Sequence, residues 1–156
     1  MVGAILAGGA GRRIGGHKAA RLLGDRPLAA YPATALAEVC ERVALVCKPG
    51  TAVPGGWRWE LWDGEPEEPR HPAAGIAYAL ERAGEPVLVC AADMPFVTAD
   101  ECRRLTAAFD QGSVAAVATA DSRLQPVLGV YSQDAVRPLR EAAKANAPLS
   151  AAVAAL

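Results

Sequence analysis

Short apolar runs alternate with longer stretches of helical periodicity along this chain. Residues 2–6 and 87–91 are apolar at nearly every position, which is typical of strands buried on both faces of a sheet. Such strands, separated by helices, form parallel sheets whose crossover helices cover both faces. The pattern therefore predicts an α/β fold: a three-layer, Rossmann-like, mostly parallel sheet with helices on both faces. The expected strands are residues 2–6, 43–47, 59–62, 87–91, 114–119 and 127–131.

Four segments have the residue spacing of helices that pack on such a sheet. Pro27 precedes the first of them and suits the first turn of a helix. The run Thr98-Ala99-Asp100-Glu101 is a capping box, which marks where the third begins. The expected helices are residues 28–39, 73–83, 98–109 and 133–146, before a closing segment at 148–156. No internal repeat or linker interrupts this order, so we predict a single domain over residues 1–156.

Between residues 49 and 72 the composition changes to proline, glycine and acidic residues, which is typical of loops. Only residues 57–61 alternate as a short strand would, and Trp57 and Trp59 would then share one face of it. The two rings could stack on a planar ligand. The interpretation we favour is that they pack together over the core.

Composition narrows the class of protein. Apolar residues make up 52% of the 156 residues, but aromatics only 5%, so the core must be built from small side chains. The formal net charge of −1 excludes the broad basic field of a protein held mainly by nucleic-acid phosphates. No apolar run approaches the roughly 20 residues needed to span a bilayer, and the N-terminus lacks a secretory signal. We expect a soluble, cytoplasmic protein with neither nucleic acid nor membrane as partner.

The four cysteines contain no C-x-x-C pair, and only two histidines are present to complete a metal site. A structural zinc site is therefore disfavoured. Cys47 and Cys90 fall near the ends of apolar runs, where a reduced thiol behaves as a small buried hydrophobe.

The most informative stretch follows the first expected strand. Residues 7–18 read A-G-G-A-G-R-R-I-G-G-H-K, five glycines interleaved with cations. Glycine lets the backbone approach a ligand closely and point successive N–H groups at phosphate oxygens. Arg13 and Lys18 would then neutralise phosphate charge, whereas Arg12 is expected to face solvent. The alternative is a flexible cationic loop without a ligand.

Two familiar phosphate-binding motifs do not fit this stretch. The Walker motif needs Ser or Thr after its lysine, but Ala19 follows Lys18. The dinucleotide motif G-x-G-x-x-G, counted from Gly9, ends on Ile14, and no acid for a ribose follows the second strand. A nicotinamide-dependent enzyme is therefore disfavoured.

A second chemical signal follows the strand at 87–91. Because ligands of an open α/β sheet bind beyond the carboxyl ends of its strands, Asp93 should lie at the same edge as the glycine-rich loop. Its carboxylate could hold Mg²⁺ together with phosphate oxygens. Alternatively, it satisfies backbone N–H groups in a turn, which is a common role of aspartate.

Taken together, these motifs resemble those of the molybdenum cofactor guanylyltransferases, within the nucleotidyltransferase superfamily. Residues 6–9 (L-A-G-G) and 13–18 (R-I-G-G-H-K) resemble the signature L-A-G-G followed by R-M-G-x-D-K, with Ile14 in place of Met and His17 in place of Asp. Residues 93–96 are similar to D-M-P-F, 71–76 to G-P-L-A-G-I, and 125–131 to [HQ]-P-L-x-A-L-Y. The family usually continues into a further strand and an N-x-N-T-P segment, whereas this sequence ends at Leu156. We therefore expect either a shortened protein or impaired activity.

The resemblance implies a nucleotide-diphospho-sugar transferase-like fold and a set of site residues. The backbone of Leu6 to Gly8 would line the purine, and Asp93 would hold magnesium. Asp63 is a candidate nucleoside contact, with a solvated loop carboxylate as the alternative. The expected catalytic residues are Arg13, Lys18 and Asp93. The expected nucleotide-binding residues are Leu6, Ala7, Gly8, Gly9, Gly11, Arg13, Lys18, Asp63 and Asp93.

The function implied is transfer of GMP from GTP to the phosphate of molybdenum-molybdopterin, with Mg²⁺ as cofactor and release of pyrophosphate. The partners implied are GTP, a molybdopterin-type substrate and a molybdoenzyme chaperone; the oligomeric state is left open. Two alternatives also stay open: cytidylyl or other nucleotidyl transfer to molybdopterin or a small phospho-acid, and a non-catalytic nucleotide-binding adaptor. His71 could contact a substrate phosphate, but a turn role before Pro72 is the favoured interpretation.

Overall fold

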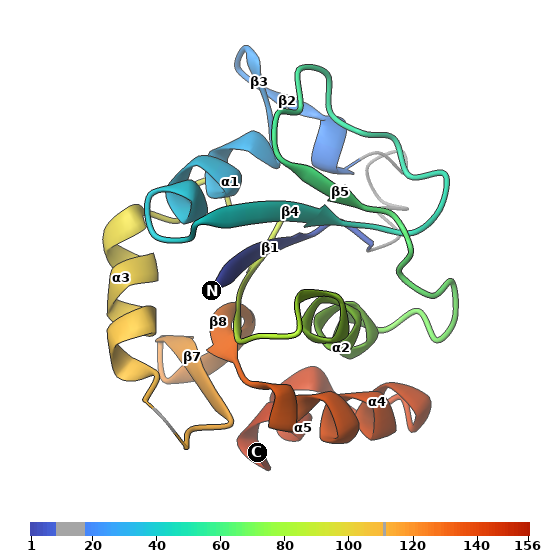
Figure 1. Ribbon diagram of the computed structural model, residues 1–156, viewed down its shortest axis with the longest axis vertical. Helices are drawn as coiled ribbons and strands as arrows, with labels where there is room; N and C mark the ends of the chain where they lie inside the picture. The colour runs from blue at the N-terminus through green and yellow to red at the C-terminus, as the bar shows by residue number, and fades with distance from the viewer. Residues whose placement is uncertain (9–17, 111) are drawn as a thin grey trace.

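A six-stranded mixed sheet forms the centre of the molecule (Figure 1). The computed structural model describes residues 1–8, 18–110 and 112–156. The strand order is β5-β4-β1-β6-β8-β7; the first four strands run parallel, and β8 runs antiparallel to both β6 and β7. The strands are β1 (Val2–Leu6), β4 (Arg42–Val46), β5 (Glu60–Trp62), β6 (Val87–Ala91), β7 (Ala115–Ala120) and β8 (Arg123–Tyr131).

Helices cover both faces of this sheet. The helices α1 (Ala30–Ala37) and α3 (Ala99–Ala108) pack on one face. The helices α2 (Pro72–Ala83), α4 (Val136–Lys144) and α5 (Leu149–Ala154) pack on the other and lie in the lower half of Figure 1. Because side chains alternate along a strand, Ile5 of β1 belongs to the α1 side and Ala4 to the α2 side. The predicted three-layer, mostly parallel α/β fold is confirmed.

Small side chains allow these layers to approach closely. Every residue of β1 pairs with both β4 and β6, so this strand is central. A Cβ on Gly3 would lie only 2.9 Å from Cδ2 of Leu36, which means that α1 packs directly on the β1 backbone. The low aromatic content of the chain is thus matched by a core of alanine, valine and leucine.

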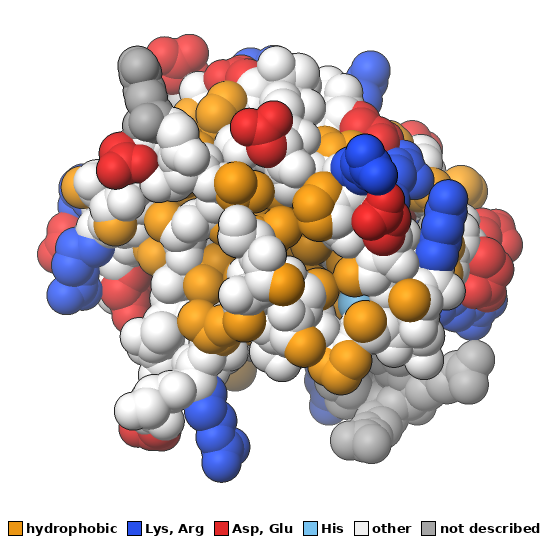
Figure 2. Space-filling view, turned by 90° about the horizontal axis from the view of Figure 1, so that it is seen from below, with side chains coloured by type: hydrophobic (Ala, Val, Ile, Leu, Met, Phe, Trp, Pro, Cys, Tyr) orange, Lys and Arg blue, Asp and Glu red, His pale blue; other side chains and the backbone are white. Residues whose placement is uncertain are grey.

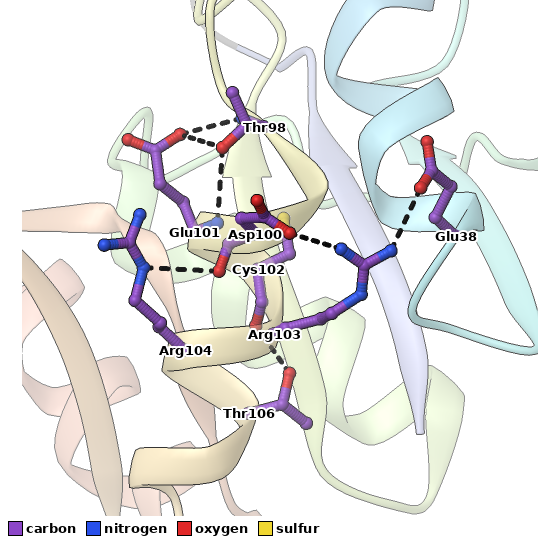
Figure 3. Close-up of polar contacts among 8 residues, drawn as sticks. All are labelled: Glu38, Thr98, Asp100, Glu101, Cys102, Arg103, Arg104 and Thr106. Atoms are coloured by element: carbon purple, nitrogen blue, oxygen red, sulfur yellow. Dashed lines mark hydrogen bonds and ion pairs between the residues drawn. The ribbon is translucent and has the colours of Figure 1, made fainter.

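Local sequence signals fix the ends of α2 and α3. His71 caps α2: its Nδ1 accepts a hydrogen bond from the backbone N–H of Ala73 at 3.2 Å, and Gly84 ends the helix with a left-handed φ of 69°. Thr98 and Glu101 form both halves of the predicted capping box on α3, as Figure 3 shows. In the same view Arg103 of α3 reaches Glu38, directly after α1, at 3.1 Å. This ion pair links the two helices of one layer.

Some predicted boundaries were wrong. The helix expected at 133–146 is divided into a 3₁₀ turn, η3 (Gln133–Ala135), and α4, and the helix expected at 28–39 is confined to Ala30–Ala37. The closing segment contains α5, and β8 begins at Arg123 rather than at residue 127. The short hairpin β2 (Leu22–Leu23) and β3 (Arg26–Pro27) was not predicted.

The tryptophan pair does not share a strand face, because β5 begins only at Glu60. Trp57 and Trp59 instead lie in the preceding loop with their rings edge to face, 4.9 Å between centroids. Both pack against the core on the α1 side. The packing interpretation of this pair is therefore the one that the structure supports. The prediction for the thiols is also confirmed, since all four cysteines are free and buried.

The surface carries charges of both signs. Figure 2 shows the molecule of Figure 1 from below, with apolar side chains over the centre of this surface and basic and acidic side chains around its rim. None of the helices that the structure describes is long and apolar enough to cross a membrane.

Candidate functional site

The residues that follow the parallel strands lie at one edge of the sheet, where the carboxyl ends of these strands meet. Backbone hydrogen bonds continue the ladder past the strand ends: Ala7 N–H donates to Val46 at 2.8 Å, and Ala92 N–H donates to Leu6 at 3.0 Å. On the outer side, Cys47 N–H donates to Trp62 at 3.0 Å. The turns after β1, β4, β5 and β6 are therefore held side by side, which is where an open α/β sheet binds ligands.

A cavity of about 330 Å³ opens at this edge. Its walls combine the end of β1, the loop after β5, the start of α2 and the turn after β6. The lining residues are Leu6, Ala7, Gly8, Glu65, Arg70, His71, Pro72, Gly75, Ala91, Ala92, Asp93 and Val127. The cavity is of a size that suits a small-molecule substrate.

Asp93 lies two residues beyond β6 and is exposed at the cavity. The turn that carries it is closed by a hydrogen bond from Met94 N–H to the carbonyl of Ala91 at 3.3 Å. Leu6, Ala7 and Gly8 line the same cavity from the neighbouring strand end. The structure thus brings the start of the glycine-rich segment and the aspartate together, as the parallel-sheet argument predicted.

Other predicted residues fall elsewhere. Asp63 is exposed and is not among the residues that line the cavity. The pKa of the Cys47 thiol is raised to about 11, mainly by burial and to a smaller extent by the charge of Asp63. Gly9, Gly11 and Arg13 lie outside the described residues, as do Arg12 and His17. The backbone of Lys18 begins a 3₁₀ turn, η2 (Lys18–Ala20).

Sequence reasoning missed Glu65. Among the described residues, it is the one charged side chain that is buried, with 4% of its surface exposed, and it lines the cavity. Its backbone N–H donates to the carbonyl of Cys47 at 3.2 Å, which pins the loop after β5 to the end of β4. Lys48 Nζ lies 3.4 Å from Glu65 Oε1. Burial raises the pKa of Glu65, and the charge of Lys48 and its hydrogen bond act in the opposite direction.

His71 and Arg70 form the opposite wall. The cap that His71 provides to α2 engages Nδ1, so the neutral ring carries its proton on Nε2. Arg70 is exposed and pairs with Glu68 at 3.0 Å. The turn role predicted for His71 is refined by the structure to a helix cap at the cavity wall.

The donor set at the cavity constrains which metal it could hold. No group of three or more His, Cys, Asp or Glu side chains gathers anywhere in the described ranges, so a metal caged by protein ligands alone does not fit there. Magnesium usually binds one or two carboxylates and completes its shell with substrate phosphates and water. Asp93, exposed at the cavity, fits that kind of site.

Comparison with solved structures identifies the fold. The chain superposes over its full length on molybdopterin-guanine dinucleotide biosynthesis protein A from Archaeoglobus fulgidus, with a TM-score of 0.77, 24% identity and 80% of that chain covered. It also matches 2-C-methyl-D-erythritol 4-phosphate cytidylyltransferase from Thermus thermophilus, with a TM-score of 0.62, 19% identity, and 99% and 84% of the two chains covered. The fold is that of the nucleotidyltransferase-like proteins.

The family follows from sequence. The chain belongs to the MobA-like NTP transferase domain family, which matches residues 3–155. It is 38% identical over 141 residues to a probable molybdenum cofactor guanylyltransferase of Deinococcus radiodurans, covering 88% of this chain and 70% of that protein. A molybdenum cofactor guanylyltransferase of Cereibacter sphaeroides is 36% identical, with 84% and 68% covered. The resemblance drawn from the motifs is confirmed.

Proposed function

We propose that this protein transfers GMP from GTP to the terminal phosphate of molybdopterin, releasing pyrophosphate and forming molybdopterin guanine dinucleotide. The observation that carries the proposal is the shared cavity of Leu6 to Gly8 and Asp93, in a chain related to guanylyltransferases. Membership of the family supports the type of reaction, which is nucleotidyl transfer. The use of GTP, molybdopterin and magnesium is proposed in addition.

The reaction is an in-line displacement at phosphorus. An oxygen of the acceptor phosphate forms a bond to the α-phosphorus of GTP, and the bond from that phosphorus to the bridging oxygen of the β-phosphate breaks. The electron pair leaves with pyrophosphate. Because the attacking oxygen is already anionic, the protein must mainly align the reactants and reduce their mutual repulsion.

Neither a catalytic base nor a cysteine nucleophile is required. The four thiols are buried, and burial raises the pKa of Cys40 to about 12 and that of Cys102 to about 11. These cysteines are therefore poor nucleophiles near neutral pH. Free thiols also suit a reducing compartment, and we place the reaction in the cytoplasm.

In this proposal the backbone of Leu6, Ala7 and Gly8 lines the base. The amides around Gly9 and Gly11, with the charges of Arg13 and Lys18, receive the triphosphate. Asp63 is left out of the contact set, because it does not line the cavity.

Asp93 would hold Mg²⁺ together with phosphate oxygens of the nucleotide. When bound there, the ion neutralises charge on the phosphates and fixes their orientation. The residues of the chain supply the remaining alignment: α2 begins at the cavity with His71 at its cap, and its N-terminus favours negative charge.

The test is product formation with purified protein, molybdopterin and Mg²⁺, supplied in turn with GTP, CTP, ATP and UTP. Pyrophosphate is measured, and the product is identified by mass. We expect turnover with GTP and a product heavier by one GMP unit. Preferred use of CTP would favour cytidylyl transfer, and tight GTP binding without pyrophosphate would favour an adaptor; either result overturns the proposal.

A further inference from the structure

The cavity contains a charged group that the proposed reaction does not use. Glu65 lies in its wall with only 4% of its surface exposed, and Lys48 Nζ lies 3.4 Å from its Oε1. Lys48 itself is mostly covered, with 16% of its side chain exposed, and also donates to the carbonyl of Pro66. Glu65 is therefore a buried carboxylate, and its Oε1 is paired with a lysine.

Burying such a pair does not by itself stabilise a fold. Taking two charges out of water costs more than their attraction usually returns, and well-packed apolar residues of similar volume are often as stable. Two glycines nevertheless make room for the Glu65 carboxylate. A Cβ on Gly8 would lie 2.0 Å from Oε2, and a Cβ on Gly75 would lie 3.4 Å from Oε1. This arrangement points to a ligand rather than to packing.

The chemistry of the carboxylate restricts which part of a nucleotide it can meet. An ionised carboxylate only accepts hydrogen bonds, so a triphosphate, which offers acceptors and the same charge, is excluded. Guanine presents two adjacent donors, N1–H and the 2-amino group, which match the two oxygens of a carboxylate in a bidentate pair. Adenine and cytosine place an acceptor beside their amino donor, and uracil has one donor between two acceptors. Guanine is the base with the best match.

The position of Glu65 agrees with a base-binding role. It is pinned to the end of β4 through Cys47, on one side of β1, whereas Asp93 follows β6 on the other side. The carboxylates of Glu65 and Asp93 therefore lie on opposite sides of the end of β1, which Gly8 follows. With the phosphates toward Asp93, the base extends toward Glu65.

We infer that Glu65 determines the nucleotide specificity of this protein by accepting hydrogen bonds from N1–H and the 2-amino group of guanine. Lys48 positions the carboxylate by holding Oε1. This inference rests on the proposed use of GTP, and it identifies Glu65 as the residue that selects GTP over other nucleoside triphosphates. Sequence motifs do not single out Glu65, because three other acidic residues occupy the same loop: Asp63, Glu67 and Glu68.

The experiment compares nucleotide binding to the folded protein without acceptor, by calorimetry in the presence of Mg²⁺. The ligands are GTP, inosine triphosphate, which lacks the 2-amino group, and 2′-deoxy-GTP. The proteins are the wild type, Glu65→Gln, and Glu67→Gln as the matched control, since Glu67 is exposed on the same loop.

We expect the wild type and Glu67→Gln to bind GTP about 10- to 100-fold more tightly than inosine triphosphate, the range of a bidentate contact to a base. In Glu65→Gln this ratio should fall to within about threefold, because an amide cannot accept two donors side by side. The ratio of GTP to 2′-deoxy-GTP should be the same in all three proteins. Circular dichroism spectra and thermal unfolding verify that the variants are folded.

Equal binding of GTP and inosine triphosphate by the wild type would overturn the inference without any variant. So would an unchanged ratio in Glu65→Gln, or a loss of discrimination against 2′-deoxy-GTP, which would assign the carboxylate to the ribose. Because no acceptor is present, the outcome is independent of turnover. Failed GMP transfer with intact guanine selection would overturn the proposed function alone.

Discussion

The two carboxylates of the cavity differ in their surroundings. Asp93 is exposed on a turn at the cavity, where a ligand from solution can reach it. Glu65 is buried beside Lys48 and cannot move without breaking that pair. This difference suits a metal-holding role for Asp93 and a selective role for Glu65.

Replacing Asp93 by Asn tests the first role. An amide keeps the size of the side chain but removes its charge, so we expect turnover to fall about 100- to 1,000-fold, as when a single group that stabilises transition-state charge is lost. Pyrophosphate release at saturating Mg²⁺ measures the effect. Asp134→Asn, an exposed aspartate that does not line the cavity, is the control and should retain full turnover. Full activity of Asp93→Asn would assign Asp93 to the turn alone.

The pH dependence of stability tests the burial of Glu65. Burial raises the pKa of this carboxyl, and Lys48 only partly opposes the effect. Above the ordinary glutamate pKa of about 4.3, the folded state then binds more protons than the unfolded state. Its free energy of unfolding must therefore decrease as the pH rises through the window between the ordinary and the raised pKa.

In Glu65→Gln the side chain at position 65 cannot ionise, so the decrease in the free energy of unfolding with rising pH is absent. Relative to the wild type, the stability of the variant should therefore increase as the pH rises above the ordinary glutamate pKa of about 4.3 and through the raised pKa of Glu65. Urea unfolding at several pH values without nucleotide measures the difference. Glu67 lies on the same loop but is exposed. The free energy of unfolding of Glu67→Gln should therefore change with pH in the same way as that of the wild type. A constant difference between Glu65→Gln and wild type would contradict the raised pKa.

Among the elements, α2 joins the cavity to the core. Its buried face includes Ile76 and Leu80, and Arg140 of α4 pairs with Glu81 of α2 at 2.6 Å. The beginning of this helix lines the cavity, and its end is fixed by Gly84. The cap at His71 should therefore contribute to the stability of the fold as well as to the shape of the site.

Substitutions at His71 separate these contributions. His71→Ala removes the acceptor for Ala73 N–H and should lower the free energy of unfolding by about 0.5–2 kcal/mol. His71→Asn should retain most of that stability, because asparagine is among the best N-cap residues. Denaturant unfolding of both variants measures the difference. Equal losses in the two would show that the ring is needed for packing rather than for the cap.

How well an element could be predicted depended on how local its signal was. The bounds of β1 and β6 were predicted correctly, because both strands are apolar on both faces, and the capping box placed the start of α3. The first half of β8 was missed because Arg123-Leu124-Gln125-Pro126 lies against the edge strand β7, where polar residues are tolerated. Tertiary pairing, rather than local preference, makes that segment a strand.

At the scale of the whole molecule, the site was predictable where it follows from topology. Parallel strands share a carboxyl edge, so the segments after β1 and β6 had to meet, and Gly8 and Asp93 do line one cavity. Glu65 was not predictable, because its place depends on a hydrogen bond to Cys47 and on Lys48 beside it. Nothing in a loop with several acidic residues indicates which of them is buried.

The cavity is built on the most central elements of the fold, and this has a consequence for stability. Leu6 and Ala91 end the two neighbouring strands β1 and β6, and Gly75 lies on the buried face of α2. A ligand held by these residues is lost when the sheet unfolds, so it should stabilise the entire molecule rather than one loop. At a GTP concentration about 100 times its Kd, linkage predicts a gain of about 2.7 kcal/mol in the free energy of unfolding.

Thermal unfolding with increasing GTP in the presence of Mg²⁺ measures this gain. We expect Tm to rise continuously with GTP concentration, and less with inosine triphosphate or CTP at the same concentrations, because inosine triphosphate lacks the 2-amino donor and CTP lacks the pair of adjacent donors. Asp93→Asn should shift the GTP curve toward higher concentration, since the phosphates lose their metal. A Tm that responds equally to all nucleotides would mean that the binding energy comes from the phosphates alone, and that the cavity does not select the base.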